Sequence, residues 1–432
     1  MTVYRKLFTV SMVLPASLLL ASCARDDGSE GQAADDVAPA TDMVIQAEGG
    51  PRVNVITEAP TGFEGTNGFT TDAAFDAALD GFGEHEDEAA GLGPLYNSDS
   101  CQSCHANPQI GGGAVTSELR AGHFNGISFV DAPGGSLIND RAIDPRIQER
   151  VPAGQEVRTF RISLPLFGDG FVECIDSNTL LAISNAQPSA QRGTLIQVPV
   201  NEAGNRIRAG RFGIKNQHAS LVSFAADAYV NEMGITSVLQ PNENTSLGTS
   251  VAAFDAVPDP EDASDATHPF GVDIQFFIDF MRALKAPPRD TAAAATASAQ
   301  RGQSLFTQIG CAVCHTPTIP TVPAGTVINQ GAFTCPTALG DKNIHPFGDF
   351  LMHNIGTGDG IVQNGGQGTR NQVRTMPLWG MRARDRLMHD ALTVTRTDAI
   401  NRHGGQGSTS RTNFNNLSAT SQQDVINFLN TL

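Results

Sequence analysis

Two short motifs in this chain combine residues that can hold a metal-bearing cofactor. Each has two cysteines three positions apart with a histidine directly after them: Cys101, Cys104 and His105 in CQSCH, and Cys311, Cys314 and His315 in CAVCH. Such a motif is compatible with a dithiol redox pair, half of a zinc site or the attachment of a c-type haem. A redox pair needs neither the histidine nor a second copy, and a four-cysteine zinc site leaves both histidines unexplained. Haem c explains all six residues, because the cysteines form thioethers and the histidine ligates the iron. We therefore expect two covalently bound haems c.

The other three of the seven cysteines stand outside these motifs. Cys23 lies at the end of an N-terminal apolar segment and is the expected site of a lipid. Cys174 and Cys335 are left over. A disulfide between them and two separate buried thiols are both compatible with the sequence, because it does not give the distance between the two residues.

The first 23 residues have the composition of an export signal. Arg5 and Lys6 precede an apolar run over residues 7–20, which is too short for a confident membrane span. The run ends in Leu20-Ala21-Ser22-Cys23, which resembles the lipobox of bacterial lipoproteins, where the cysteine becomes the lipidated N-terminus. Because Ala24 rather than an aspartate follows, the resemblance favours the outer membrane, facing the periplasm. Residues 24–58 lack periodicity and are expected to form a flexible tether.

The composition excludes some classes of function. Asp and Glu number 45 against 28 Lys and Arg, a formal net charge of −17 in 432 residues. Nucleic-acid binding needs a basic surface, so no nucleic acid is expected as a partner. The acidic balance instead favours a basic electron-transfer partner. No other segment is apolar for about 18 residues, so we expect no further membrane span.

The segments that must position the motifs indicate helices joined by long loops. Helical patterns occur over residues 70–82, 272–290, 297–311 and 421–432. The second is expected to stop at Pro287-Pro288, which cannot continue a helix. In the last, Ser421 and Asp424 suit a cap, and Val425, Phe428, Leu429 and Leu432 form an apolar stripe.

A weak internal repeat indicates two similar halves. PLFGDGF follows Cys101 at nearly the same distance along the sequence as PLWGMRA follows Cys311. Their aromatic residues, Phe167 and Trp379, are expected to pack in a core. With a boundary near residue 290, the fold class expected is mainly α, with two tandem cytochrome c-like haem domains and long loops. The N-terminal haem domain would cover residues 59–290 and the C-terminal one residues 291–432.

From about residue 60 to 432 the chain resembles a known family. The stretches that carry the resemblance are GLGPLYNSDSCQSCH (91–105), RISLPLFGDGFVECID (161–176), GRFGIKNQHASL (210–221), NEMGITS (231–237), HPFGDFLMHNIGTGDG (345–360) and PLWGMRARDRLMHD (377–390). They are similar to bacterial dihaem oxidoreductases once described as thiol oxidoreductases. These are relatives of dihaem cytochrome c peroxidase and of the methylamine-dehydrogenase maturation enzyme. The resemblance implies one haem that reacts and one that relays electrons.

For the C-terminal haem, the resemblance implies a second axial ligand. In the relatives a histidine precedes the distal ligand of the electron-transfer haem at a fixed spacing, and His389 and His403 have this spacing. His403 would then ligate the iron opposite His315, with the following glycine pair letting the backbone approach the ring. The relatives have Met or Tyr there, and bis-histidine ligation lowers the potential. His345 and His353 are expected to pack or hydrogen bond near a haem propionate or the interface.

For the N-terminal haem, the candidates opposite His105 are His123, His218 and an open position. The resemblance places Glu232 on the acid/base residue of the peroxidases, which moves a proton as the O–O bond breaks. Gln217 could hydrogen bond the distal oxygen. His123 lies in a loop resembling the one from which relatives lend a removable ligand, so it could block the iron at rest and move away on reduction.

Several details refine this expectation. A helix over residues 216–232 would place His218 and Glu232 on one face, because their separation in the sequence is close to a whole number of helical turns. Burial beside a haem would raise the pKa of Glu232. Two positions depart from the peroxidases: their distal glutamine is Val222 here, and a threonine that binds their calcium between the haems is Arg384. Calcium is therefore possible but less expected.

The sequence thus favours a lipid-anchored dihaem c-type oxidoreductase of the cell envelope with peroxidase-like or oxidase-like activity. Electrons from a redox partner protein or small donor would enter at the C-terminal haem, and peroxide, dioxygen or an organic substrate would react at the N-terminal one. The alternatives are a non-catalytic dihaem electron carrier and a maturation enzyme that acts on a partner protein.

Overall fold

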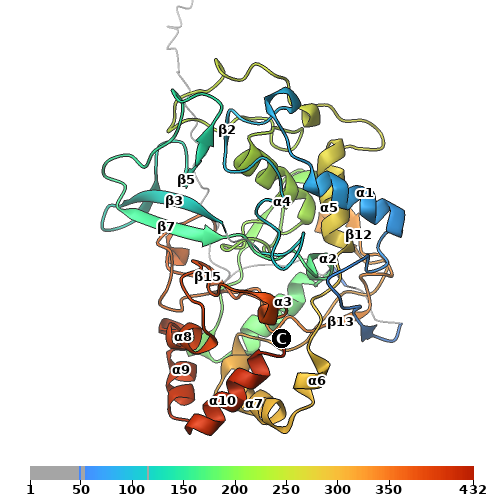
Figure 1. Ribbon diagram of the computed structural model, residues 1–432, viewed down its shortest axis with the longest axis vertical. Helices are drawn as coiled ribbons and strands as arrows, with labels where there is room; N and C mark the ends of the chain where they lie inside the picture. The colour runs from blue at the N-terminus through green and yellow to red at the C-terminus, as the bar shows by residue number, and fades with distance from the viewer. Residues whose placement is uncertain (1–47, 50–53, 114–115) are drawn as a thin grey trace, which may run out of the picture. The chain divides into compact units, whose positions relative to one another are not determined.

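A computed structural model describes residues 48–49, 54–113 and 116–432 of the chain. The expected signal peptide, Cys23 and most of the expected tether lie outside these residues. The expectation of a mainly α fold is wrong, because 32% of the residues are helical and 16% lie in strands. The strands form several small sheets between the helices (Figure 1).

The helices are short and are spread along the described part of the chain. Their bounds are α1 Asp72–Gly83, α2 Asp169–Glu173, α3 Ser177–Ala186, α4 Leu221–Ala228, α5 Val272–Ala283, α6 Thr291–Ala294, α7 Ala297–Gln308, α8 Arg396–Asn401, α9 Ser408–Asn415 and α10 Ala419–Leu429. A single π-helical turn, η5 (Tyr229–Met233), continues α4. In Figure 1, α1 lies beside α5, and α7 lies beside α10 near the C-terminal end.

Most strands are only two to four residues long. They are β1 Thr57–Glu58, β2 Leu95–Tyr96, β3 Ser117–Phe124, β4 Phe129–Asp131, β5 Leu137–Ile138, β6 Arg141–Ala142, β7 Val157–Ile162, β8 Gln197–Val200, β9 Arg206–Ala209, β10 Ile319–Pro320, β11 Val327–Ile328, β12 Phe333–Thr334, β13 Lys342–Ile344, β14 Met352–His353 and β15 Val373–Arg374. β3 is the longest and pairs antiparallel with β4, β5 and β7. This four-stranded sheet follows the first cysteine motif, and no sheet of this size follows the second within the described residues.

The structure confirms most of the expected helices but changes some of their ends. α1 is capped by Thr71, and α10 buries the stripe formed by Val425, Phe428, Leu429 and Leu432. The cap of α10 is Ser418 rather than Ser421, whose backbone N–H is the donor to the Ser418 hydroxyl. α5 ends at Ala283, before the prolines, because Leu284 turns extended and pairs with Thr66.

The main core crosses the boundary expected near residue 290. It joins residues 59–286 to residues 319–379, while a second core holds α7, α9 and α10 together. Cys174 and Cys335 form a disulfide across the same boundary, with a Cα–Cα distance of 6.0 Å. β1, at the end of the expected tether, pairs with β13. The two halves of the chain therefore share one core.

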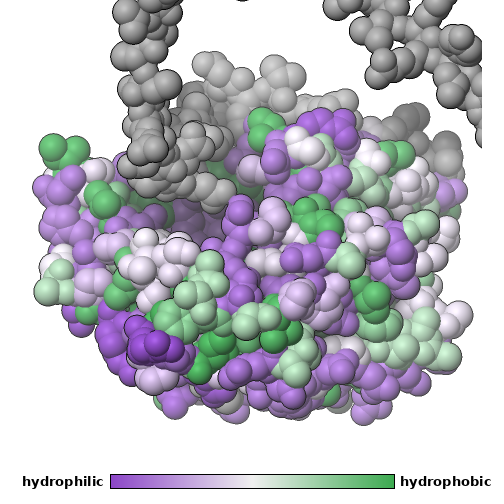
Figure 2. Space-filling view, turned by 90° about the horizontal axis from the view of Figure 1, so that it is seen from above, coloured by the Kyte–Doolittle hydropathy of each residue, from purple (hydrophilic) through white to green (hydrophobic). Residues whose placement is uncertain are grey.

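The surface and the helix lengths bear on membrane contact. Within the described residues no helix is both long enough and apolar enough to cross a bilayer. On the face shown in Figure 2, hydrophobic side chains lie scattered among hydrophilic ones.

Candidate haem sites

The second cysteine motif opens on a cavity of about 1580 Å³, part of which is open to solvent. This C-terminal cavity is lined by Cys311, Cys314, His315 and His403, and by side chains of α7, α8 and α10. Nδ1 of His315 hydrogen bonds the carbonyl oxygen of Phe347 at 3.0 Å. A metal-binding histidine is commonly held this way through its other ring nitrogen, which leaves Nε2 for the metal.

The rings of His315 and His403 face each other across this cavity. Their centroids are 6.3 Å apart, and their planes make an angle of 59°. A metal–nitrogen bond of about 2 Å on each side, with half an imidazole ring beyond it, separates two opposed rings by roughly 6 Å. Nδ1 of His403 bonds the Ala399 carbonyl oxygen at 2.7 Å, so Nε2 is its free nitrogen too. Burial lowers the pKa of His315 to about 4 and also lowers that of His403. Both rings are therefore neutral at pH 7, the form that binds a metal.

The glycine pair after His403 lies close to a neighbouring stretch of backbone. Gly404 donates its N–H to the Ile355 carbonyl oxygen at 2.6 Å. A Cβ on Gly405 would lie 2.3 Å from the carbonyl oxygen of Asn354. The pair thus lets the chain approach the backbone of residues 354–356, which fixes the loop that carries His403.

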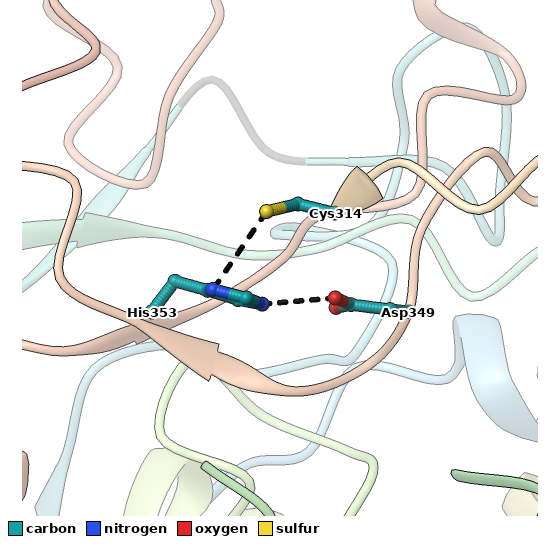
Figure 3. A group of neighbouring side chains, drawn as sticks. All are labelled: Cys314, Asp349 and His353. Carbon is teal, nitrogen blue, oxygen red and sulfur yellow. Dashed lines mark hydrogen bonds and ion pairs between the residues drawn. The ribbon is translucent and has the colours of Figure 1, made fainter. Parts of the chain in front are cut away.

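His353 forms a compact group with Cys314 and Asp349 (Figure 3). Its Nε2 lies 2.8 Å from Oδ2 of Asp349 and its Nδ1 3.7 Å from the Cys314 sulfur. Burial alone would lower the pKa of His353, but the hydrogen bond to Asp349 raises it to about 10. The three side chains could hold a metal ion. Because Cys314 belongs to the attachment motif, we instead assign His353 to the wall of the C-terminal cavity.

The two other histidines of this half lie in different surroundings. His345 is half exposed and bonds Glu58 and Thr318. His389 is buried at the C-terminal cavity, and its Nε2 bonds the carbonyl oxygen of Thr357 at 2.5 Å.

The first cysteine motif opens on an N-terminal cavity of about 1280 Å³, including solvent-open space. Cys101, Cys104 and His105 line it, and Nδ1 of His105 bonds the Gly112 carbonyl oxygen at 3.1 Å. Burial lowers the pKa of His105 to about 4. The ring of His105 contacts Phe82, with centroids 6.1 Å apart. His218 also lines this cavity, but within the described residues no histidine ring contacts that of His105 as His403 contacts His315.

The three residues expected to act in catalysis all line the N-terminal cavity. Glu232 lies on the π-helical turn η5, and such turns frequently occur at functional sites. Its backbone carbonyl oxygen accepts hydrogen bonds from the N–H groups of Asn97 and Ser98, and its Oε2 accepts one from the Asn97 side chain at 2.8 Å. Glu232 is thereby tied to the segment directly before the first motif.

The expected helix over residues 216–232 is wrong. Ser220 is extended and caps α4, which begins only at Leu221. His218 and Gln217 lie in the preceding loop, where Oε1 of Gln217 accepts a hydrogen bond from Lys215 N–H. Nε2 of His218 lies 3.0 Å from Oδ2 of Asp227 on α4. The loop, helix and π turn together bring the residues to the cavity.

α4 itself is held by a buried carboxylate. Glu173 accepts a hydrogen bond from the N–H of Leu221 at 2.9 Å and two from Arg282 at 2.7 and 3.0 Å. Burial alone would raise the pKa of Glu173, but Arg282 holds it below its usual value. The start of α4, and with it the cavity wall, is therefore fixed by an ionised group.

The structure does not bring His123 to the N-terminal cavity. Residues alternate between the faces of a strand, and Glu118 and Arg120 of β3 line the cavity. His123 belongs to the opposite set, is exposed, and lies 2.7 Å from Glu156. Ligation of the haem iron by His123 stays a prediction.

Sequence reasoning missed the charged wall that the sheet supplies. Glu118 accepts two hydrogen bonds from Arg120, at 2.7 and 3.2 Å, and lies 3.7 Å from Arg161 of β7. Arg161 in turn bonds Asp359, a residue of the C-terminal half. The only sequence signal for this wall was the alternation of charged and uncharged residues in SELR and FRI. The same alternation is typical of strands that expose one face to solvent.

The two cavities meet at a shared wall. Residues 162–164 and Arg374 line both. Arg374 and Arg384 form no ion pair with a carboxylate within the described residues, and Nε of Arg384 is buried without a hydrogen-bond partner. Burial lowers the pKa of each to about 10. Buried guanidinium groups need anions, and the carboxylates of a haem fit this requirement.

The aromatic residues of the repeat pack in the main core, as expected. Phe167 and Trp379 are buried in the main core. A Cβ on Gly168 would lie 2.7 Å from the Trp379 ring, so the two repeats meet at a position where only glycine fits.

The cysteines of both motifs fit haem attachment better than thiol chemistry. All four are free of disulfides. Burial raises the pKa of Cys101 and raises that of Cys311 to about 12. Redox-active and metal-binding cysteines have lowered pKa values instead, so the burial argues against a dithiol switch. A haem bound here would supply the redox chemistry of its iron.

Comparisons with known proteins agree with this arrangement. A family described as "Di-haem oxidoreductase, putative peroxidase" matches residues 141–432, which include the second motif but not the first. No curated protein sequence matches the chain.

Three solved structures match most of the chain at low sequence identity. A MauG-like protein associated with microbial copper homeostasis is 15% identical, with 88% of this chain and 94% of that one covered, at a TM-score of 0.39. The diheme peroxidase BthA from Burkholderia thailandensis is 14% identical, with 88% and 92% covered, at 0.39. Hydrazine synthase from Kuenenia stuttgartiensis is 15% identical, with 89% and 100% covered, at 0.34. The family match covers more than half of the chain, and the protein therefore belongs to the di-haem oxidoreductase family.

Proposed function

We propose that the protein binds two covalent haems c and reduces peroxide at the N-terminal one. The observation that carries the proposal is the difference between the two cavities. His315 and His403 oppose each other in one, whereas His105 faces a cavity lined by Glu232 and Gln217 in the other. A six-coordinate iron relays electrons, and an open position beside an acid/base group allows chemistry.

The proposed direction of electron flow follows from this difference. A redox partner protein or a small donor reduces the C-terminal haem, and electrons cross the shared wall at residues 162–164. Reduction of one hydrogen peroxide breaks the O–O bond and consumes two electrons and two protons to give two waters. Glu232 moves a proton between the two oxygens, and Gln217 and His218 position the peroxide.

Two measurements test the proposal on the haem-loaded protein. Electron paramagnetic resonance of the resting or half-reduced protein is expected to give a high-spin ferric signal from one haem and a low-spin bis-histidine signal from the other. Peroxide turnover is expected to fall roughly 10²-fold or more in Glu232→Gln. Two low-spin haems that do not respond to peroxide in either state would refute it and favour a non-catalytic electron carrier.

We also propose that the protein is a lipoprotein of the cell envelope. The lipobox-like sequence before Cys23 and the disulfide between Cys174 and Cys335 support this location, because disulfides persist outside the cytosol. Incorporation of a labelled fatty acid into the wild type and its loss in Cys23→Ser would test the anchor.

A further inference from the structure

The N-terminal cavity contains a second carboxyl group directly beside Glu232. Glu118 comes from β3, far before Glu232 in the sequence, and both side chains line the cavity. A hydrogen bond between the two carboxyl groups lowers the pKa of Glu118 and raises that of Glu232. A carboxylate only accepts hydrogen bonds, so two ionised groups in this position would repel, and a hydrogen bond between them requires one proton.

The charges around the pair differ on its two sides. Glu118 faces the guanidinium groups of Arg120 and Arg161, at 2.7 and 3.7 Å. Glu232 accepts a hydrogen bond from the neutral amide of Asn97, and Arg120 interacts with it less strongly than with Glu118. The carboxyl groups of Asp227 and Asp131 also interact electrostatically with the guanidinium group of Arg120. The ionised form is therefore favoured on Glu118 and the protonated form on Glu232.

The pKa directions agree with this division. Burial raises the pKa of Glu232, and the neighbouring Glu118 raises it further. Burial would also raise that of Glu118, but Arg120 and Arg161 hold it below its usual value.

We propose that Glu118 shares a proton with Glu232 and holds it while Glu232 works as the base. This inference rests on the proposed peroxide reduction. As Glu232 takes the proton from one peroxide oxygen, its own proton moves to Glu118. Glu232 then gives the peroxide proton to the leaving oxygen, which departs as water when the O–O bond breaks. The shared proton is one of the two consumed in forming the second water; solvent supplies the other, and the reduced donor supplies both electrons. Glu118 acts through Glu232 and is a positioning residue.

Infrared spectroscopy of the haem-loaded protein tests the shared proton directly. The wild type at pH 7 is expected to have a protonated-carboxyl C=O band that shifts in D₂O and is missing in Glu232→Gln. In Glu118→Gln the neighbouring negative charge is lost, so the pKa of Glu232 falls and the band is expected to disappear at a lower pH than in the wild type. Glu118→Asp keeps a carboxyl group and is expected to restore the wild-type pH dependence of the band. Asp144→Asn, at a surface pair with Arg146, is the matched control and leaves the band unchanged.

Turnover supplies the second readout. Glu118→Gln is expected to lower the maximal peroxide rate about tenfold, and the acid limb of its pH profile moves to lower pH by roughly one unit or more. A band that disappears at the same pH in Glu118→Gln and the wild type, or an acid limb that does not move, would overturn the inference. If the wild type does not reduce peroxide, the proposed function fails, while the band still decides whether the two carboxyl groups share a proton.

Discussion

Replacing Asp359 by asparagine is expected to destabilise the protein strongly, because it leaves two buried cations without their anion. The side chain of Asp359 is 0% exposed and accepts hydrogen bonds from Arg161 at 2.6 and 2.9 Å. It also lies 2.8 Å from Nζ of Lys215, and the side chains of Arg161 and Lys215 are 1% and 0% exposed. Removing one partner of such a buried pair costs about 3–5 kcal/mol of unfolding free energy.

Lys215 and Arg161 are expected to respond differently to the loss of Asp359, and this difference determines which of them contributes most of the lost unfolding free energy. Burial lowers the pKa of Lys215 to about 8 even with Asp359 present, so this amine can lose its proton once the carboxylate is gone. Arg161 keeps its charge, because a guanidinium does not deprotonate in this range. Most of the loss should therefore come from Arg161. Loss of Asp359 lowers the folded pKa of Lys215 further below its unfolded one, so the amine becomes neutral below pH 8 in the variant. The cost of Asp359→Asn should therefore decrease as the pH rises towards about 8.

A double-mutant cycle in guanidinium chloride, followed by far-ultraviolet circular dichroism, measures this coupling. Arg161→Met leaves Asp359 paired with Lys215 and should cost less than Asp359→Asn. The double variant should be more stable than the sum of the single losses predicts, by about 0.5–3 kcal/mol. Additive losses, or a cost below about 1 kcal/mol for Asp359→Asn, would refute the reasoning. The ion pair of Arg161 with Asp359 links the two halves of the chain. Haem-loaded protein is used for all variants, so that the two halves are compared in the same state.

Three further perturbations have expected outcomes. His403→Ala should convert the C-terminal haem from low to high spin in the ferric state, seen by electron paramagnetic resonance; an unchanged low-spin signal would mean that another group opposes His315. Arg384→Met should lower the reduction potential of the nearby haem, by about 60 mV if the guanidinium contributes about 1.4 kcal/mol. Arg384→Lys should restore most of that potential in a spectroelectrochemical titration, and equal potentials in all three proteins would contradict the assignment. Replacing Cys174 and Cys335 by serine should cost about 5 kcal/mol of unfolding free energy, because the disulfide joins residues 161 apart; denaturation of the variant and of the wild type with and without reductant would measure it.

The residues that sequence reasoning found best are those whose chemistry is local. The two attachment motifs are contiguous, so their spacing alone indicates haem c, and each opens on its own cavity. His403 came from a spacing in related proteins, and the structure places its ring opposite that of His315. Helices with caps and apolar stripes were also predicted well, because helix periodicity is a strong signal.

The β structure was missed for a physical reason. Most strands have two to four residues, which is too short for a periodic pattern. In β3 the face with Glu118 and Arg120 is the one that lines the cavity, while Leu119 and Ala121 pack on the other side. Charged residues on one face of a strand usually indicate solvent, so the pattern concealed a buried functional wall. Pairs such as Glu118 with Glu232 depend on long-range packing that no local pattern encodes.

The difference between the two haem sites arises outside the motifs. Both motifs have the same residues, and both proximal histidines bond a backbone carbonyl oxygen through Nδ1. What differs is the chain that covers the opposite side. After α8 a loop held against residues 354–356 presents His403, so the C-terminal iron would be closed by an imidazole. At the N-terminal site the π turn η5 and the sheet around β3 present carboxyl, amide and guanidinium groups instead. The axial ligand decides whether an iron relays electrons or reacts. The four-stranded sheet has no counterpart among the described residues of the C-terminal half. We therefore infer that this sheet is the element that would make the N-terminal haem reactive.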